Sequence, residues 1–237
     1  MSSVTNRHSP PGTTREIRQT LRQLYTKAPW KDSLYIQGRA WLIDFETIDL
    51  MIAENSRILD LACGYGLLAN YISLSQPGRT VHGVDLSPRR IKIARQTIQD
   101  RARISFSMGD ITQFTPSDYD AITFIDSLHY FDLPTQRMIL QRCFESLSPQ
   151  GKLILREASK KPSWKHALNY AHEWIMTHSH FTPTRDKKIQ LNFLNGAQWE
   201  ALLRSVGFEA VKTIPPRHWA PYTDTFYVGY KKSPPYA

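Results

Sequence analysis

Cysteine is scarce in this sequence, with Cys63 and Cys143 the two in 237 residues. Two cysteines without a metal-ligand spacing form neither a disulfide framework nor a zinc centre, and their scarcity is typical of a reducing compartment. No apolar run approaches the roughly 18 residues of a membrane-spanning helix, and residues 1–12 are polar and proline-bearing, unlike a secretory leader. These absences predict a soluble, cytoplasmic protein without membrane insertion.

The sequence also lacks an internal repeat, and its hydrophobic content of 41% is ordinary for a globular chain. We therefore expect one domain over residues 13–237, behind a disordered tail at residues 1–12 that ends in a Pro-Pro-Gly breaker. Helical spacing of apolar residues predicts helices at about 13–27 and 34–51, within an N-terminal helical region over residues 13–53.

The formal net charge of +9 raises the question of an anionic partner. Part of this charge belongs to six basic residues on or beside one predicted helix: Arg89, Arg90, Lys92, Arg95, Arg101 and Arg103. A basic run on one amphipathic helix is typical of a solvated face, and no RNA-binding motif with interleaved aromatic residues accompanies it. The sequence therefore predicts no nucleic-acid partner.

One stretch organises the chain: a short apolar run ends in Asp60 and breaks into Gly64 and Gly66. Such a run is typical of a buried parallel strand, and the glycines let the backbone turn into a helix whose N-terminal N–H groups face a ligand. The two glycines also fit the G-x-G-x-x-A dinucleotide fingerprint, and Asp85 lies 19 residues (85 − 66) beyond. Asp60 would, however, meet the pyrophosphate, and two like charges about 4 Å apart cost roughly 4 kcal/mol at an effective dielectric constant near 20. The loop favours a cationic ligand, with an NAD-linked oxidoreductase as the alternative.

Strand and helix patterns alternate along the rest of the chain. Apolar runs predict strands at residues 58–61, 80–87, 103–111, 119–126, 152–157, 208–214 and 225–230, with helices at about 134–147 and 197–206 and a turn at 149–151. This pattern predicts an α/β fold with a Rossmann-like, doubly wound, mostly parallel sheet of seven strands. Asp60, Asp85 and Asp110 stand at successive strand tips 25 residues apart (85 − 60 and 110 − 85), and ligands of open α/β sheets bind beyond those tips.

Residues 58–66, with Ala62 in place of the usual first glycine, closely resemble the first motif of the class I S-adenosylmethionine-dependent methyltransferases. S-adenosylmethionine carries a sulfonium and an ammonium and no phosphate, which suits an acid at the strand tip. The resemblance implies an antiparallel C-terminal hairpin in the sheet. It also implies a set of cofactor-binding residues: Asp60, Ala62, Cys63, Gly64 and Gly66 in the loop, Asp85 with Leu86 at the ribose, and Asp110 with Ile111 at the adenine. Asp126, after the fourth strand, is also predicted to bind the cofactor, because ligands of open α/β sheets bind beyond the strand ends. Arg39, on the second predicted helix, is the candidate for the cofactor carboxylate, with a surface charge as the other interpretation.

Other segments resemble, more narrowly, stand-alone bacterial methyltransferases of fatty-acid-like or aryl-polyene pathways: residues 126–130, 155–157, 163–164, 199–203 and 207–208. This resemblance implies methyl transfer to a small-molecule or carrier-bound acceptor. An RNA methyltransferase and a catalytically inactive cofactor-binding protein stay as alternatives. The acceptor, the methylated atom and the oligomeric state are left open.

His129 follows the predicted fourth strand, where cofactor and acceptor would meet. If the acceptor is a hydroxyl, a histidine there is the candidate general base, because its pKa lies near neutral pH. A structural histidine bonded to the loop backbone is the other interpretation. Contact with the acceptor is predicted for Tyr130, Glu157, Trp164 and His172, the last two in an acceptor-facing insertion at about 160–195 rich in aromatic residues and histidine. Those histidines lack the spacing of a zinc site, so no metal is predicted.

Overall fold

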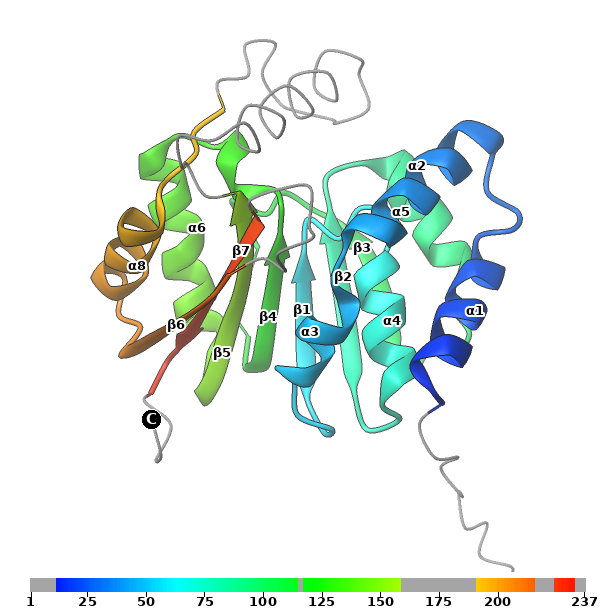
Figure 1. Cartoon of the computed structure of the whole chain (residues 1–237), viewed down its shortest axis with the longest axis horizontal. Helices are drawn as coiled ribbons and strands as arrows, with labels where there is room; N and C mark the ends of the chain where they lie inside the picture. The colour runs from blue at the N-terminus through cyan, green and yellow to red at the C-terminus, as the bar shows by residue number, and fades with distance from the viewer. Residues whose placement is uncertain (1–11, 115–116, 159–190, 216–223, 233–237) are drawn as a thin grey trace, which may run out of the picture.

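The structure is a computed structural model that describes residues 12–114, 117–158, 191–215 and 224–232. Its centre is a sheet of seven strands in the order β3-β2-β1-β4-β5-β7-β6 (Figure 1). The strands are β1 (Arg57–Leu61), β2 (Thr80–Asp85), β3 (Ile104–Met108), β4 (Tyr119–Ile125), β5 (Leu147–Ala158), β6 (Ala210–Ile214) and β7 (Asp224–Tyr230). The first five are parallel, and β7 runs antiparallel to both β5 and β6. This arrangement confirms the predicted fold class.

Helices cover both faces of the sheet and form two separate apolar clusters with it. One cluster holds residues of α1 (Thr14–Leu24), α2 (Trp30–Leu42), α3 (Phe45–Leu50), α4 (Leu67–Ser75) and α5 (Pro88–Gln96). The other holds residues of α6 (Leu133–Ser146) and α8 (Gly196–Ser205). In Figure 1, α6 and α8 lie on one side of the strands and α1, α4 and α5 on the other. Every loop after a parallel strand therefore opens at one edge, between the two helix layers.

The prediction of one continuous helix over residues 34–51 is wrong. It consists of α2, which begins at Trp30, and α3, which begins at Phe45. Between them Ile43 is extended, and Asp44 accepts hydrogen bonds from the Thr47 N–H (3.2 Å) and hydroxyl (2.8 Å). Because an aspartate at this position satisfies the first free N–H groups of a helix, it starts a new one.

The fifth strand is longer than predicted. It begins at Leu147, and the residues expected to form a turn before it lie inside the strand as an irregularity. Tyr119 pairs with Leu147 but Ala121 pairs with Lys152, so residues 148–151 stand opposite a single residue of β4. Local turn signals in the Pro-Gln-Gly sequence were therefore overridden by pairing across the sheet.

Three arginines of the basic helix α5 contact neighbouring elements, although Arg89 and Arg95 remain exposed, as the predicted solvated face implies. Arg89 forms an ion pair with Asp32 (2.8 Å), and Arg95 donates to a backbone carbonyl of β3 (3.0 Å). Arg90 lies over the rings of Tyr35 and Tyr65, with its guanidinium carbon 5.5 Å from each centroid. These charges connect α5 to α2 and to the glycine loop.

Candidate active site

The glycine loop at residues 62–66 joins β1 to α4 through three residues with positive φ: Ala62 (55°), Gly64 (58°) and Gly66 (77°). At Gly66 a Cβ atom would lie 2.5 Å from the ring of Phe106, so no other residue fits without displacing that side chain. Ala62 adopts the left-handed region at a cost of roughly 1–2 kcal/mol. The departure from glycine that the sequence shows at this position is thus tolerated as local strain.

Asp85, at the end of β2, holds this loop in place. One carboxylate oxygen accepts the Gly64 N–H (2.9 Å) and the other accepts the Ser87 N–H (2.8 Å). The side chain is buried, and each oxygen keeps a second lone pair that a ribose hydroxyl could use. Its role at the ribose stays a prediction.

The predicted adenine-binding residues follow the neighbouring strand. Leu86 is 40% exposed beside Asp85, and Ile111 is buried. Asp110 stands two residues beyond β3, where one of its oxygens accepts the N–H (2.9 Å) and the hydroxyl (2.8 Å) of Thr112. Their order along the strand tips matches the expectation, and their contact with a cofactor stays a prediction.

A pocket of about 210 Å³ opens at the carboxyl ends of β1 and β4. Six of the predicted cofactor-binding residues line it: Arg39, Asp60, Ala62, Cys63, Gly64 and Asp126. Tyr130, predicted to contact the acceptor, also lines it. Gly66, Asp85, Leu86, Asp110, Ile111, His129 and Glu157 do not. The structure thus brings the glycine loop, α2 and the turn after β4 together around one cavity.

Asp60 is the buried acid of this pocket, with 2% of the residue exposed. One oxygen accepts the hydroxyl of Thr123 (2.7 Å), and the other has no hydrogen-bond partner among the described residues. Burial raises the pKa of Asp60 to about 7, against the opposing effect of the Thr123 hydrogen bond, and the charge of Asp85 adds to the rise. A buried carboxylate with an unused acceptor suits a cationic ligand, because the ligand would offset the cost of burying the charge.

Burial also raises the pKa of the Cys63 thiol well above its usual value, which excludes a thiolate nucleophile at neutral pH.

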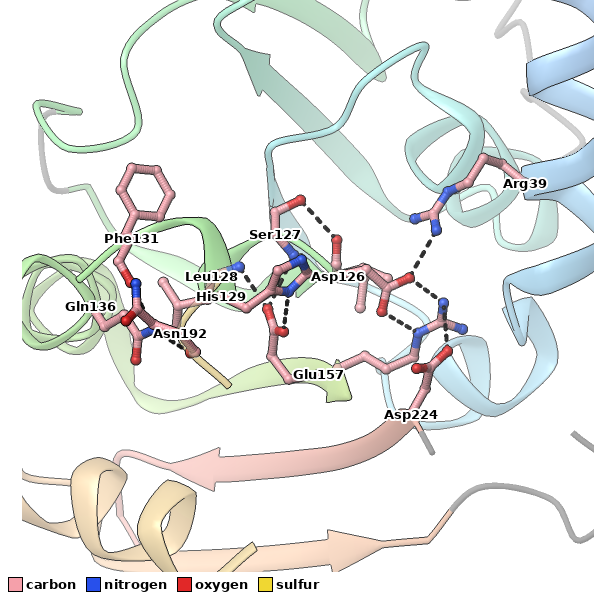
Figure 2. Close-up of polar contacts among 12 residues, drawn as sticks. Arg39, Asp126, Ser127, Leu128, His129, Phe131, Gln136, Glu157, Asn192 and Asp224 are labelled. Carbon is pink, nitrogen blue, oxygen red and sulfur yellow. Dashed lines mark hydrogen bonds and ion pairs between the residues drawn. The ribbon is translucent and has the colours of Figure 1, made fainter. Parts of the chain in front are cut away.

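Two arginines and two aspartates form a charged group, of which Arg39 and Asp126 line the pocket. Asp126, at φ 52° directly after β4, accepts from Arg39 (3.0 Å) and from Arg156 Nε (2.8 Å). Figure 2 shows Arg39 pointing at Asp126 from the side of α2. Arg156 is buried, donates to the Leu42 carbonyl (3.0 Å), and lies 3.6 Å from Asp224, the first residue of β7. Arg39, predicted to bind the cofactor carboxylate, would therefore have to share its guanidinium with Asp126.

His129 and Glu157 form the second polar centre of the site (Figure 2). Glu157, at the end of β5, is fully buried: one oxygen lies 2.6 Å from His129 Nδ1, and the other accepts the N–H groups of Ser127 (3.0 Å) and Leu128 (2.6 Å). Because a carboxylate only accepts, Nδ1 carries the hydrogen and Nε2 is the basic nitrogen. The prediction that Glu157 contacts the acceptor is not supported by this arrangement, since no surface of Glu157 is exposed. We assign it to holding His129.

The ring of His129 packs against two aromatic rings. It stacks on Phe193, with centroids 4.7 Å apart and planes at 21°, and it lies 4.3 Å from the ring of Tyr130. Since Tyr130 lines the pocket and His129 does not, His129 is one side chain away from the cavity. Trp164 and His172, the other predicted acceptor contacts, fall outside the described residues.

Gln136 on α6 connects the two segments that flank His129. Its amide nitrogen donates to the carbonyls of Phe131 (3.0 Å) and Asn192 (3.1 Å), and the Asn192 N–H donates to the His129 carbonyl (2.8 Å). Figure 2 shows Gln136 beside both residues. Sequence reasoning missed Gln136, although a signal existed: it occupies the buried face of α6, at helical spacing with Ile139 and other apolar residues. It also missed Arg156, a charged residue directly after the apolar run 153–155.

Neither a metal nor a membrane span is indicated in the part of the chain that the structure describes. No group of three or more histidine, cysteine, aspartate or glutamate side chains there could hold a metal ion. None of the helices in the described ranges is both long and apolar enough to cross a bilayer.

The strand order, the antiparallel β7 and the glycine loop after β1 define the fold of a class I methyltransferase. Comparison with known proteins agrees, because residues 58–151 match the model of a family described as a methyltransferase domain. The structure of human N-acetylserotonin methyltransferase in complex with S-adenosylmethionine superposes with a TM-score of 0.64, covering 92% of this chain and 57% of that one at 15% identity. The chain therefore has the fold of the class I methyltransferases, and its residues 58–151 match the methyltransferase-domain family.

Two curated relatives match in sequence over about half of this chain. Phosphoethanolamine N-methyltransferase of Plasmodium falciparum is 28% identical over 120 residues, 49% of this chain and 45% of that protein. Ubiquinone biosynthesis O-methyltransferase of Xanthomonas euvesicatoria is 30% identical over 112 residues, 46% of this chain and 45% of that protein. The matches thus span less than half the length of either relative.

Proposed function

We propose that this protein transfers a methyl group from S-adenosylmethionine to a hydroxyl group of a small-molecule acceptor. The observation that carries the proposal is the His129–Glu157 pair, which stands beside the pocket that the glycine loop and Asp60 enclose. The names of the two relatives, an N- and an O-methyltransferase, support methyl transfer to small molecules. A carrier-bound acceptor, expected from the narrower sequence resemblance, is compatible with the same site.

The residues present fit S-adenosylmethionine. The buried Asp60 oxygen would hold positive charge, the loop at Gly64 gives the close approach of backbone that a nucleoside needs, and Asp85 would hold the ribose. When bound, this cofactor supplies an electrophilic methyl group on a sulfonium. The chain's own contribution is alignment of the acceptor, which can lower a barrier by roughly 7–11 kcal/mol.

His129 would act as general base. Its Nε2 takes the proton of the acceptor hydroxyl, and the carboxylate of Glu157 stabilises the imidazolium that results. General-base catalysis of this kind contributes about 10²- to 10⁴-fold. Because Tyr130 lines the pocket and its ring lies 4.3 Å from that of His129, which does not, we infer that Tyr130 turns aside when the acceptor binds.

Calorimetry with S-adenosylhomocysteine and with NAD tests the cofactor side of this proposal. The site should bind S-adenosylhomocysteine and leave NAD unbound, because Asp60 would oppose a pyrophosphate. Tight binding of NAD alone would contradict the proposal and favour an NAD-linked oxidoreductase.

The affinity for S-adenosylmethionine should rise with pH because of Asp60. A folded-state pKa of about 7 leaves this carboxyl mostly protonated at pH 6 and ionised at pH 8, so the affinity for a cation should increase about tenfold between them. By the same linkage, Asp60 stabilises the ligand-free fold at acidic pH, and this contribution is lost as the pH rises through 7. Calorimetry across this range checks the affinity, and Asp60→Asn corrects for the ligand's own titration. An equal change of affinity with pH in the parent and in Asp60→Asn would show that Asp60 does not cause the pH dependence.

Gln136→Met should lower kcat about tenfold, because methionine has a similar shape but loses both donors that hold the segments beside His129. The affinity for the cofactor should not change. In a His129→Gln background the same substitution should have almost no further effect, because Gln136 acts through His129. Gln141→Met, on the same helix, is the matched control. Independent, multiplying effects of the two substitutions would show that Gln136 does not act through His129.

A further inference from the structure

Helix α2 is apolar on two faces. Its inner face buries Ile36 in the core, while its outer face exposes Trp30 (69%), Leu34 (63%) and Trp41 (67%). These three residues are four and eleven positions apart (34 − 30 and 41 − 30), which at about 3.6 residues per turn places them within roughly 40° of one another. They form one row, here called the α2 outer row.

The exposure of two tryptophans on one helix face is unusual. Trp199, by comparison, is fully buried. Single exposed apolar residues are normal on a protein surface and need no explanation, but aligned ones mark a contact surface. Gln37 is also exposed on this face and donates to the Ser33 hydroxyl (3.1 Å), so the row contains one uncharged polar side chain and no charged one.

A second copy of the chain is a poor occupant for this row. Two tryptophans and a leucine, each partly exposed, present on the order of 400 Å². A stable protein interface takes about 800 Å² from each partner. The area of the row is thus about half of what each partner of a stable dimer contributes. Binding through so small an apolar surface needs an additional electrostatic attraction.

The charges around the row favour an anionic surface. Lys27, Lys31 and Arg89 are exposed near the start of α2, and Lys31 Nζ lies 5.4 Å from the centroid of the Trp30 ring. The one acidic residue of the helix, Asp32, is buried and paired with Arg89. Indole rings prefer the boundary between lipid and water, and lysine and arginine beside them attract anionic headgroups.

We propose that the α2 outer row docks the protein on an anionic lipid bilayer, with the two indoles at the headgroup level. The helix would lie on the membrane and not cross it. The opposite side of the same helix lines the pocket through Tyr35, Arg39 and Leu42, so docking would hold the pocket one helix diameter, roughly 10 Å, from the bilayer. If the proposed function holds, this position suits an acceptor that partitions into lipid.

Co-sedimentation of the full chain with vesicles tests this proposal without cofactor or acceptor, so its outcome is separate from that of the methyl-transfer assay. The protein should bind vesicles of phosphatidylcholine with about 30% phosphatidylglycerol, and bind pure phosphatidylcholine much more weakly. Trp30→Ser with Trp41→Ser should weaken binding about tenfold or more. Leu50→Ser, which removes an apolar side chain that is 87% exposed on α3, is the matched control and should bind like the parent.

Acrylamide quenching and sedimentation velocity complete the test. Vesicles should protect tryptophan fluorescence in the parent and not in the double variant, with circular dichroism confirming that the variant is folded. No vesicle binding, or binding that the double variant retains in full, would overturn the proposal. A parent dimer that the double variant loses would overturn it as well and assign the row to a second copy.

Discussion

With His129 replaced by glutamine, turnover is expected to fall by about 10²-fold or more while the affinity for S-adenosylmethionine stays the same. Glutamine cannot take a proton, and His129 does not line the pocket, so the cofactor site stays intact. Steady-state kinetics and calorimetry on the same preparation check both parts. The activity that remains should no longer depend on a group that titrates near neutral pH.

Glu157→Gln is the companion variant. Its amide oxygen can still accept from Ser127 and Leu128, but the negative charge that stabilises protonated His129 is gone. The amide nitrogen would then face Nδ1 and donate to it, so the neutral ring would carry its hydrogen on Nε2 and turnover should fall as it does in His129→Gln. Full turnover in His129→Gln would mean that His129 is structural and that the reaction relies on alignment alone.

Asp85→Ala should weaken binding of S-adenosylmethionine by roughly 10- to 150-fold. Hydrogen bonds to a charged group contribute about 1.5–3 kcal/mol, and this carboxylate both fixes the Gly64 N–H and is positioned to accept the ribose hydroxyls. Asp85→Asn, which keeps one acceptor oxygen, should lose less. Calorimetry gives both values, and an unchanged affinity in the alanine variant would remove Asp85 from the cofactor site.

Most of the fold follows from local patterns in the sequence. Buried parallel strands are continuous apolar runs, and caps such as Thr13 with Glu16 mark where helices start. The failures have long-range or competing causes. Asp44 divides a helix that apolar spacing alone predicts as continuous, and β5 extends to Leu147 because β4 offers a partner there. The Asp44 cap is a local signal that competes with the apolar spacing, whereas the start of β5 cannot be read from its own segment.

The candidate site was predictable where its residues stand at strand tips. Asp60 and Asp126 line one pocket because parallel strands end at the same edge of the sheet. What the sequence could not supply is the pairing between side chains. Glu157 contacts His129 from 28 positions away, and Arg156 meets both Asp126 and Asp224. Such contacts depend on which strands are neighbours and on which way each side chain points, so a single sequence leaves them open.

The central claim is methyl transfer from S-adenosylmethionine to a hydroxyl group, and it is tested most directly by following a labelled methyl group. The protein is incubated with methyl-labelled S-adenosylmethionine and a panel of phenols, other hydroxylated small molecules, carrier-bound acids and RNA, and the products are separated by mass spectrometry. We expect label on the oxygen of a small hydroxylated acceptor, in equal amount with S-adenosylhomocysteine, and no such product from His129→Gln above about one hundredth of the parent rate. Label found on RNA, or on none of the acceptors although S-adenosylmethionine is bound, would contradict the account.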